Sequence, residues 1–406
     1  MVFQRDNGAS VIITGWIRRK DRSLNQAPSA DGKQLRWRCL VLVLEVVVIA
    51  KVIVGMSGGV DSAAAACLLK QAGHDVIGIT LRTWLSADGQ EGRCCEIDDA
   101  RKAAWTLGIR YWAWNCISEF RNQVITPFLD DYIHGLTPNP CTRCNRYVKW
   151  DKMLYLTKVF DADFIATGHY ASVVKLPNGR YTVQKALHAE KDQTYMLYRL
   201  TQEQLAATLM PLGGISKQEA REIARQAGLS VADKADSQEI CFVTDGNYAD
   251  FIRENAGALA PGEGSFVDES GTVLGRHKGI IHYTVGQRKG LGLALGYPAY
   301  VKEIRPDRNE VVIGKEEELY RTCITVRDIH FMSIFPLNKG EVLRCRAKVR
   351  YHHKEQPACL EMIDEDNMRV NFDRPVRAAA PGQAAVFYDE NDCVIGGGSI
   401  GRDGGN

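Results

Sequence analysis

The sequence has 406 residues, too many for one compact core, so two or three domains are expected. Its hydrophobic share of 45% and charged share of 25% are typical of a soluble folded protein. A net charge of only +2 excludes a uniformly basic protein, so any surface that binds nucleic acid must be a local patch.

Residues 1–50 differ in texture from the rest of the chain. Basic residues cluster at 18–22, and a polar stretch leads to the apolar run LVLVLEVVVIA at 40–50. A membrane span needs about 20 apolar residues, and this run is shorter and contains Glu45. We treat 1–50 as an atypical N-terminal extension. A flexible arm, a transit peptide and a true start near residues 46–48 stay open, although Asp6 and Asp21 are unusual in a transit peptide.

From residue 51 onward, strand and helix patterns alternate. Strands are predicted at 51–56, 75–81, 110–115 and 163–170, and helices at 63–73, 98–108, 118–135, 144–160, 202–210 and 216–228. Strand–helix–strand units imply parallel strands joined by right-handed crossovers. Residues 51–243 are therefore predicted to form an α/β domain with a doubly wound parallel sheet.

The pattern changes after residue 243. Residues 244–322 hold short β-like runs between Gly-rich turns, at 263–268, 271–275, 279–285 and 299–304, and are predicted to form a small central domain. Residues 323–406 carry an all-β pattern, with strands at 323–331, 341–352, 358–363 and 384–400. Short strands at this spacing predict a C-terminal β-barrel.

The most informative stretch is the Gly-rich loop GMSGGVDS at 55–62, between a predicted strand and a predicted helix. Such a loop brings backbone N–H groups close to phosphates, and the helix N-terminus adds a favourable dipole. The loop has neither the GK[ST] ending of a Walker motif nor the GxGxxG of a dinucleotide fold. A plain tight turn is the competing interpretation.

The chain has twelve cysteines and no evident secretory signal. Scattered thiols in a chain this long indicate a reducing compartment, and a cytoplasmic location is predicted. Cys141 and Cys144 form a CxxC in TPNPCTRCN. This spacing can supply metal ligands, a redox disulfide or a catalytic thiol, but structural zinc normally needs four ligands and no second CxxC is present.

The segment SGGVDS resembles the pyrophosphate loop of the N-type ATP pyrophosphatases, the PP-loop superfamily. These enzymes cleave ATP to AMP and pyrophosphate while they adenylate an oxygen of the substrate. The resemblance implies an ATP site with Mg²⁺, in which Asp61 organises the loop. The implied ATP-binding residues are Gly55, Met56, Ser57, Gly58, Gly59, Val60, Asp61, Ser62, Leu81 and Gly168.

Longer segments extend the resemblance. CCEIDDARKAAWTLGI, TPNPCTRCNRYVKW, FIATGHYA, KDQTYMLYRL, DSQEICFV, HYTVGQRKGLG and PGQAAVFY occur in this order. Over about residues 51–400, they resemble the tRNA-specific 2-thiouridylases, which replace O2 of the wobble uridine with sulfur. The resemblance implies that ATP adenylates O2 and that a cysteine persulfide supplies the sulfur. The products would be 2-thiouridine, AMP and pyrophosphate.

The resemblance also implies a role for individual residues. Cys144 matches the attacking thiol and Cys241 the cysteine that carries the persulfide, and the family forms a disulfide between these two positions. The implied tRNA-binding residues are Asn139, Pro140, Cys141, His169, Lys191, Asp192, Gln193, Arg350, Tyr351 and Gln383. The implied partners are Lys, Glu and Gln tRNAs and a persulfide donor such as a cysteine desulfurase, with no membrane.

The role of Cys141 stays open. The family has Asp or Cys at this position, and the Asp has a base or base-orienting role that Cys141 does not inherit. Cys141, Cys144 and Cys241 could instead hold a 4Fe-4S cluster, as in related RNA thiolases. Inert buried thiols are a further alternative.

A basic strand pattern lies in LRCRAKVRYHHK, where Arg344, Arg346, Lys348 and Arg350 alternate with apolar residues. Because side chains alternate between the two faces of a strand, one face is predicted to be basic. This face suits contacts to RNA phosphates, although a solvated outer face shows the same alternation.

Two other functions fit parts of the sequence. A PP-loop ligase that uses ammonia is disfavoured by Cys241 in SQEIC. A non-catalytic RNA-binding or metal-binding protein is disfavoured by the intact SGGVDS loop.

Overall fold

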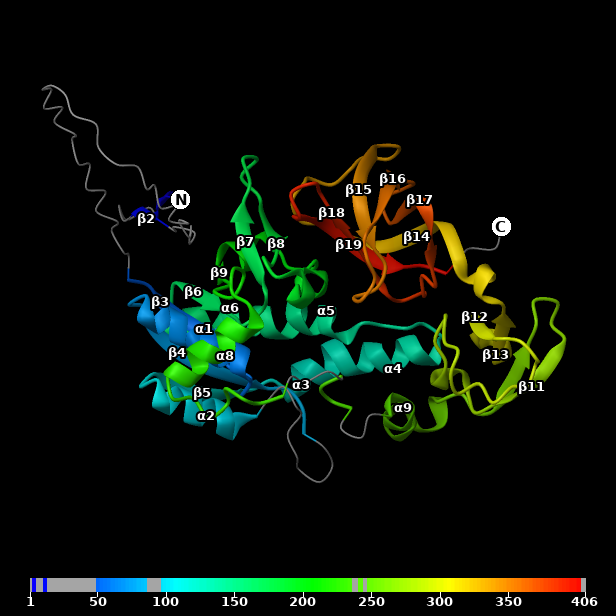
Figure 1. Cartoon of the computed structure of the whole chain (residues 1–406), viewed down its shortest axis with the longest axis horizontal. Coiled ribbons are helices and arrows are strands. Elements are labelled where there is room, and N and C mark those ends of the chain that lie inside the picture. Colours follow the sequence, from blue (N-terminus) through cyan, green and yellow to red (C-terminus); the bar gives the residue numbers. More distant parts are fainter. Residues whose placement is uncertain are drawn as a thin grey trace, which may run out of the picture. The chain divides into compact units, whose positions relative to one another are not determined.

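The computed structural model describes residues 2–4, 10–12, 49–85, 96–235, 240–243 and 247–402 (Figure 1). Contacts divide the chain into two units, Met1–Ala50 and Lys51–Asn406. In the first unit, strands β1 (Val2–Gln4) and β2 (Ser10–Ile12) pair antiparallel. The basic cluster at 18–22 and most of the apolar run at 40–50 lie outside the described residues.

A five-stranded parallel sheet organises the first part of the larger unit. Its order is β5-β4-β3-β6-β9, and every neighbouring pair is parallel. The strands are β3 (Lys51–Gly55), β4 (Asp75–Arg82), β5 (Arg110–Asn115), β6 (Phe164–Ala166) and β9 (Thr208–Leu209). The order reverses direction between β3 and β6, and in open α/β sheets ligands bind at the carboxyl ends of strands at such a point.

Helices cover both faces of this sheet, which confirms the doubly wound α/β prediction. Because the crossovers are right-handed and the order reverses at β3, α1 and α2 lie on one face and α6 on the other. The run Ala63–Ala66 is almost completely buried, so α1 packs closely with α8 and the sheet. The main helices are α1 (Val60–Gln71), α2 (Ile97–Thr106), α6 (Asp151–Phe160) and α8 (Lys217–Gln226).

The predicted helix at 118–135 contains a wider π-helical turn. It runs as α3 (Ile117–Phe120), η1 (Arg121–Ile125) and α4 (Thr126–Ile133). The CxxC helix has the same character, with α5 (Pro140–Cys144) followed by the π-helical η2 (Asn145–Trp150) and then α6. Such turns insert an extra residue into the helix and frequently occur at functional sites.

Two predictions in this region need correction or addition. The segment 202–210 is not one helix, because α7 (Gln202–Ala206) ends and Thr208 pairs with Ile165 to form the edge strand β9. The sequence interpretation also missed an antiparallel hairpin of β7 (Ala171–Lys175) and β8 (Tyr181–Lys185). Two short 3-10 turns follow it, η3 (Ala189–Lys191) and η4 (Thr194–Met196).

The middle of the larger unit holds a helix and a four-stranded sheet. The sheet order is β11-β10-β13-β12. The predicted strand at 279–285 is wrong, because Ile280–His282 forms the 3-10 turn η6 beside Gly279, whose φ is +119°. The elements are α9 (Tyr248–Ala256), η5 (Gly257–Leu259), β10 (Gly264–Val267), β11 (Val273–His277), β12 (Tyr300–Arg305), η7 (Pro306–Arg308), β13 (Glu310–Gly314) and η8 (Glu316–Leu319).

The last part of the chain closes into a six-stranded barrel, as predicted (Figure 1). The sequence interpretation missed one strand, β17, in which every second residue from Met368 to Phe372 is buried. The barrel order is β14-β17-β16-β15-β18-β19. The strands are β14 (Tyr320–Phe331), β15 (Val342–Lys348), β16 (Gln356–Met362), β17 (Asn367–Arg377), β18 (Ala384–Tyr388) and β19 (Val394–Ile400).

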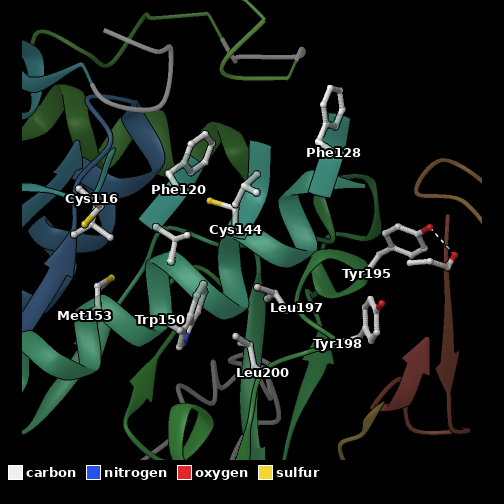
Figure 2. Packing of buried hydrophobic residues seen from close by; sticks show 14 of the residues in the cluster. Cys116, Phe120, Phe128, Cys144, Trp150, Met153, Tyr195, Leu197, Tyr198 and Leu200 are labelled. Atoms are coloured by element: carbon white, nitrogen blue, oxygen red, sulfur yellow. Dashed lines mark hydrogen bonds between the residues drawn. The ribbon is translucent and has the colours of Figure 1, made fainter. Parts of the chain in front are cut away.

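One hydrophobic cluster joins the α/β part to the barrel. It contains Phe120, Cys144 and Trp150 as well as residues of β18 and β19 (Figure 2). The Tyr195 hydroxyl donates to the Ala384 carbonyl at 2.8 Å across this junction. Of the helices in the described part of the chain, none combines the length and apolar character needed to cross a membrane.

Candidate nucleotide and sulfur-transfer site

The Gly-rich loop follows β3 at the carboxyl edge of the sheet. The Met56 amide donates to the Ile79 carbonyl at 2.8 Å, and the Thr80 hydroxyl donates to the Met56 carbonyl at 2.6 Å. Both bonds tie the loop to the neighbouring strand β4. The loop therefore begins from a fixed position between two buried strands.

Two serines shape the interior of the loop. The Ser62 hydroxyl accepts from the Ser57 amide at 3.1 Å and donates to the Gly59 carbonyl at 3.0 Å. Gly58 has φ of +81°, and a Cβ there would lie 2.6 Å from the Glu96 carbonyl oxygen. The glycine at 58 is thus required both by its backbone conformation and by the close approach of Glu96.

Asp61, in the first turn of α1, is held from two sides. Both of its carboxylate oxygens lie 2.8 Å from Lys217 Nζ, and one accepts from the Tyr170 hydroxyl at 2.7 Å. A capping box between Ser216 and Glu219 fixes the start of α8 and so places Lys217. The prediction that Asp61 organises the loop fits this arrangement.

Lys234 approaches the loop from the segment after α8. Its Nζ lies 3.4 Å from the Gly58 carbonyl oxygen, 2.6 Å from an Asp99 carboxylate oxygen and in hydrogen-bond contact with Glu96. The sequence interpretation missed Lys217, Lys234, Glu96 and Asp99. They lie 35 or more residues from SGGVDS, and only the fold brings them to it.

Residues 168–170 connect this loop to the predicted tRNA site. A Cβ on Gly168 would lie 2.6 Å from the Asp61 carbonyl carbon and the Ser62 amide nitrogen, so only glycine fits here. Tyr170 contacts Asp61 through its hydroxyl, while its backbone exchanges two 3.0 Å hydrogen bonds with Gln193. Leu81, by contrast, is a buried core residue near the end of β4.

His169 lies half-buried between these two groups of residues. Its ring is 5.4 Å from that of Trp150, and Nδ1 is 2.9 Å from the Thr167 hydroxyl oxygen. Burial, with a smaller contribution from the nearby Lys149 ammonium, lowers the pKa of His169 to about 3. His169 is therefore neutral at physiological pH and can accept or donate one hydrogen bond.

The CxxC helix is held in place by amide side chains. The Asn139 side chain caps α5 by accepting from the Cys141 amide at 3.1 Å. Asn145, just after Cys144, donates to the Met196 carbonyl at 3.0 Å. Pro140 occupies the first turn, where a missing N–H costs nothing. The segment is thus firmly anchored to the turn η4.

The two cysteines of the motif differ in exposure. Cys141 is exposed, whereas Cys144 is 5% exposed and lies in the core cluster with Phe120 and Trp150 (Figure 2). Cys241 is half-buried and packs against the same cluster. Cys144 and Cys241 are both in the thiol form, so the implied disulfide is not formed in this structure.

Among the side chains that the structure describes, no three from His, Cys, Asp and Glu gather closely enough to hold a metal ion. The set Cys141, Cys144 and Cys241 therefore does not form a cluster site in this conformation. Surrounding atoms raise the pKa of the Cys141 thiol, and the nearby Lys149 ammonium opposes this rise.

The three residues 191–193 have different surroundings. The buried Asp192 carboxylate accepts from the Thr194 hydroxyl at 2.7 Å and from the Ala186 amide at 3.3 Å. The Gln193 side chain accepts from the Tyr170 amide. Lys191 is half-buried at the end of η3. The Asp192 and Gln193 side chains thus shape the site from within.

The predicted tRNA residues of the barrel lie close to these turns. The Tyr351 hydroxyl donates to the Asp192 carbonyl at 3.1 Å, and the Gln383 amide donates to the Thr137 carbonyl, just before the CxxC, at 2.8 Å. Arg350 is turned the other way, toward the Val285 carbonyl at 2.6 Å. The fold therefore brings Asn139, Cys141, Gln193, Tyr351 and Gln383 into one neighbourhood.

The alternating pattern in β15 is observed, but carboxylates neutralise part of its basic face. Arg344 makes two 2.8 Å hydrogen bonds to Asp373, and Arg346 pairs with Asp392 at 2.8 Å. Burial lowers the pKa of Lys348. This face is therefore less positive than the sequence alone implies.

A separate hollow of about 430 Å³ opens at the carboxyl ends of β4 and β5. None of the predicted site residues lines it. Its lining is Arg82, Ile97, Asp98, Arg101, Ala113, Trp114 and Asn115.

Three family descriptions match successive parts of this chain. A tRNA methyl transferase HUP domain matches residues 50–245, a tRNA methyl transferase PRC-barrel domain matches 249–315, and an aminomethyltransferase β-barrel domain matches 321–400.

Curated relatives match nearly over their full length. The tRNA-specific 2-thiouridylase MnmA of Lachnoclostridium phytofermentans is 51% identical over 86% of this chain and 99% of its own. The protein of the same name from Acetivibrio thermocellus is 49% identical, with the same coverage. Among solved structures, the U34-tRNA thiolase NcsA from Methanococcus maripaludis with its 4Fe-4S cluster matches 52% of this chain and 67% of that chain. The identity is 21% and the TM-score 0.32.

Proposed function

The chain belongs to the tRNA-specific 2-thiouridylase family, and from this premise we propose that it is an ATP-dependent sulfurtransferase acting on the wobble uridine of tRNA. One observation carries the proposal. Residues Gly168 to Tyr170 join the phosphate-binding loop to the CxxC neighbourhood, so a nucleotide and a base can occupy adjacent positions.

The loop at 55–62 binds the pyrophosphate part of ATP. Its backbone N–H groups lie at the N-terminus of α1, where the helix dipole favours negative charge. Because Gly59 caps the helix without a side chain, the approach to this terminus is unobstructed. ATP adenylates O2 of the uracil ring, pyrophosphate leaves, and C2 becomes open to attack.

Sulfur is delivered by two cysteines. The terminal sulfur of a persulfide on Cys241 attacks C2, and Cys144 attacks the Cys241 sulfur to release the transferred atom. AMP leaves with the former O2, and the resulting Cys144–Cys241 disulfide is reduced before the next cycle. Each attack requires a thiolate or persulfide anion.

Neutral His169 and the base-site residues hold the flipped-out uridine. The target base must leave its stack, because C2 is otherwise inaccessible. Asn139, Pro140, Cys141 and His169 would surround it, while Lys191, Arg350 and Gln383 contact the tRNA. We extend this proposal to Lys, Glu and Gln tRNAs and to a persulfide donor such as a cysteine desulfurase, in the cytoplasm.

Mg²⁺ would accompany ATP through the phosphates, which is its usual mode in nucleotide sites. Asp61 is occupied by Lys217 in this structure, so a direct metal bond would require that ion pair to open. The donor set for a 4Fe-4S cluster does not come together among the described residues, and the reaction above uses none.

The reaction products test the proposal. Purified protein is incubated with ATP, a persulfide donor and unmodified tRNA, and the nucleosides are analysed by mass spectrometry. We expect 2-thiouridine at the wobble position, together with AMP and pyrophosphate. A methylated nucleoside, as the family descriptions would suggest, or unchanged uridine contradicts the proposal.

A further inference from the structure

Lys234 reaches the phosphate-binding loop across a long sequence separation. It contacts the Gly58 carbonyl, 176 positions away, and the carboxylates of Glu96 and Asp99, which precede and begin α2. The Glu96 amide also donates to the Ser57 carbonyl at 3.3 Å. The lysine and both carboxylates thus border the position where phosphates would enter.

The charges at this position favour an exchange of partners. Two carboxylates beside a loop that receives polyphosphate would repel it, and a single ammonium offsets only part of that charge. Burial alone would lower the pKa of Lys234, but the hydrogen bonds to Asp99 and Glu96 outweigh it and raise the pKa. The lysine therefore stays protonated and is available to an incoming anion.

Exposure distinguishes Lys234 from the other lysine at the loop. The Lys217 side chain is 13% exposed and spans both oxygens of Asp61, which Tyr170 also holds. The Lys234, Glu96 and Asp99 side chains are 30%, 38% and 34% exposed. Lys217 is thus built into the frame, whereas solvent and ligand can reach the Lys234 cluster.

We infer that Lys234 is a phosphate-binding residue of the ATP site, which Glu96 and Asp99 hold beside the loop until ATP arrives. On binding, the flexible lysine stem carries Nζ from the carboxylates to the phosphates. The inference rests on the ATP-binding part of the proposed function and is independent of the sulfur chemistry.

Direct ATP binding without divalent cations or tRNA tests this inference, with isothermal titration calorimetry as the readout. Lys234→Met should weaken ATP binding about tenfold or more, the range expected for loss of a charge-assisted hydrogen bond. Lys158→Met, an exposed lysine on α6, serves as the matched control and should bind ATP like the wild type. The melting temperature of each ligand-free variant shows whether it is folded.

The paired variant Glu96→Gln, Asp99→Asn gives a result of opposite sign. It releases Lys234 and removes two negative charges, so ATP should bind at least as tightly as to the wild type. Wild-type affinity in Lys234→Met, or weakened affinity in the paired variant, would overturn the inference. If the wild type binds ATP but makes no 2-thiouridine, the proposed function fails while the Lys234 result still stands.

Discussion

Cys144 is enclosed by apolar side chains, and this burial sets a requirement on the reaction. Its exposure is 5%, and Phe120, Val148 and Trp150 share its cluster. A thiol in that position meets neither solvent nor a base. Sulfur transfer by Cys144 therefore requires α5 and the π-helical η2 to rearrange, and the insertion of an extra residue makes such a turn a plausible place to do so.

Asp131, on α4, offers a residue-level test of the electrostatics near this helix. Burial raises its pKa to about 6, although Arg143 acts in the opposite direction. A raised carboxyl pKa contributes stability below the usual value of 3.8 that is lost as pH rises through about 6. Asp131→Asn should thus stabilise the protein at pH 7–8 by roughly 1–2 kcal/mol after solvent screening.

Thermal unfolding of this variant at several pH values checks the sign. The gain should shrink as pH falls below 6 and vanish near pH 3–4, where both forms are neutral. Asp130→Asn is the control, because Asp130 is exposed and pairs with His134. A destabilised Asp131→Asn protein at pH 8 would show that the carboxylate has a stabilising partner.

Elements with a strong local pattern were predictable from the sequence. The apolar run of β3, the alanine-rich α1 and the alternation of β15 each carry their own periodicity. The errors fall where partners decide the structure. Thr208 and Leu209 continue a helical pattern and become a strand only because β6 offers an edge, and Ile280–His282 turns because Gly279 takes a positive φ.

The site shows the same division. SGGVDS is a local signal, so its position between β3 and α1 could be predicted. Lys217 and Lys234 carry no local signal, because a lysine becomes a loop contact only when α8 packs against α1. The burial of Cys144 could not be predicted either, since the two prolines favoured an accessible loop.

The connection between β6 and β7 gives a test at the element scale. Gly168→Ala would place a Cβ 2.6 Å from the backbone of Asp61 and Ser62. The overlap should cost about 1–3 kcal/mol of stability and displace the start of α1, which weakens ATP binding. Gly214→Ala is the matched control, because its Cβ meets no atom within 4 Å. Normal melting and ATP binding by Gly168→Ala would refute this packing argument.

Contacts between the α/β part and the barrel assemble the proposed tRNA site from distant sequence. The Thr182 hydroxyl donates to the Val394 carbonyl at 2.7 Å, and the largely buried Arg199 pairs with Asp328 at 2.6 Å. Gln383 and Thr137 meet at the CxxC. Residues more than 200 positions apart therefore act as one surface.

At the scale of the whole chain, the larger unit should function without the extension. Its first strand is anchored by the Lys51 amide, which donates to Asp163 at 2.9 Å, and contacts separate it from Met1–Ala50. Deletion of residues 1–49 should leave the melting temperature and the rate of 2-thiouridine formation unchanged. Loss of folding would show that the extension is structural.

The central claim is that Cys241 carries the sulfur that replaces O2 of uridine. The most direct measurement is nucleoside mass spectrometry of tRNA after incubation with ATP, a persulfide donor and either the wild type or Cys241→Ser. We predict 2-thiouridine with the wild type and none with the variant, although the variant should still bind ATP. A normal yield of 2-thiouridine from Cys241→Ser would contradict the account.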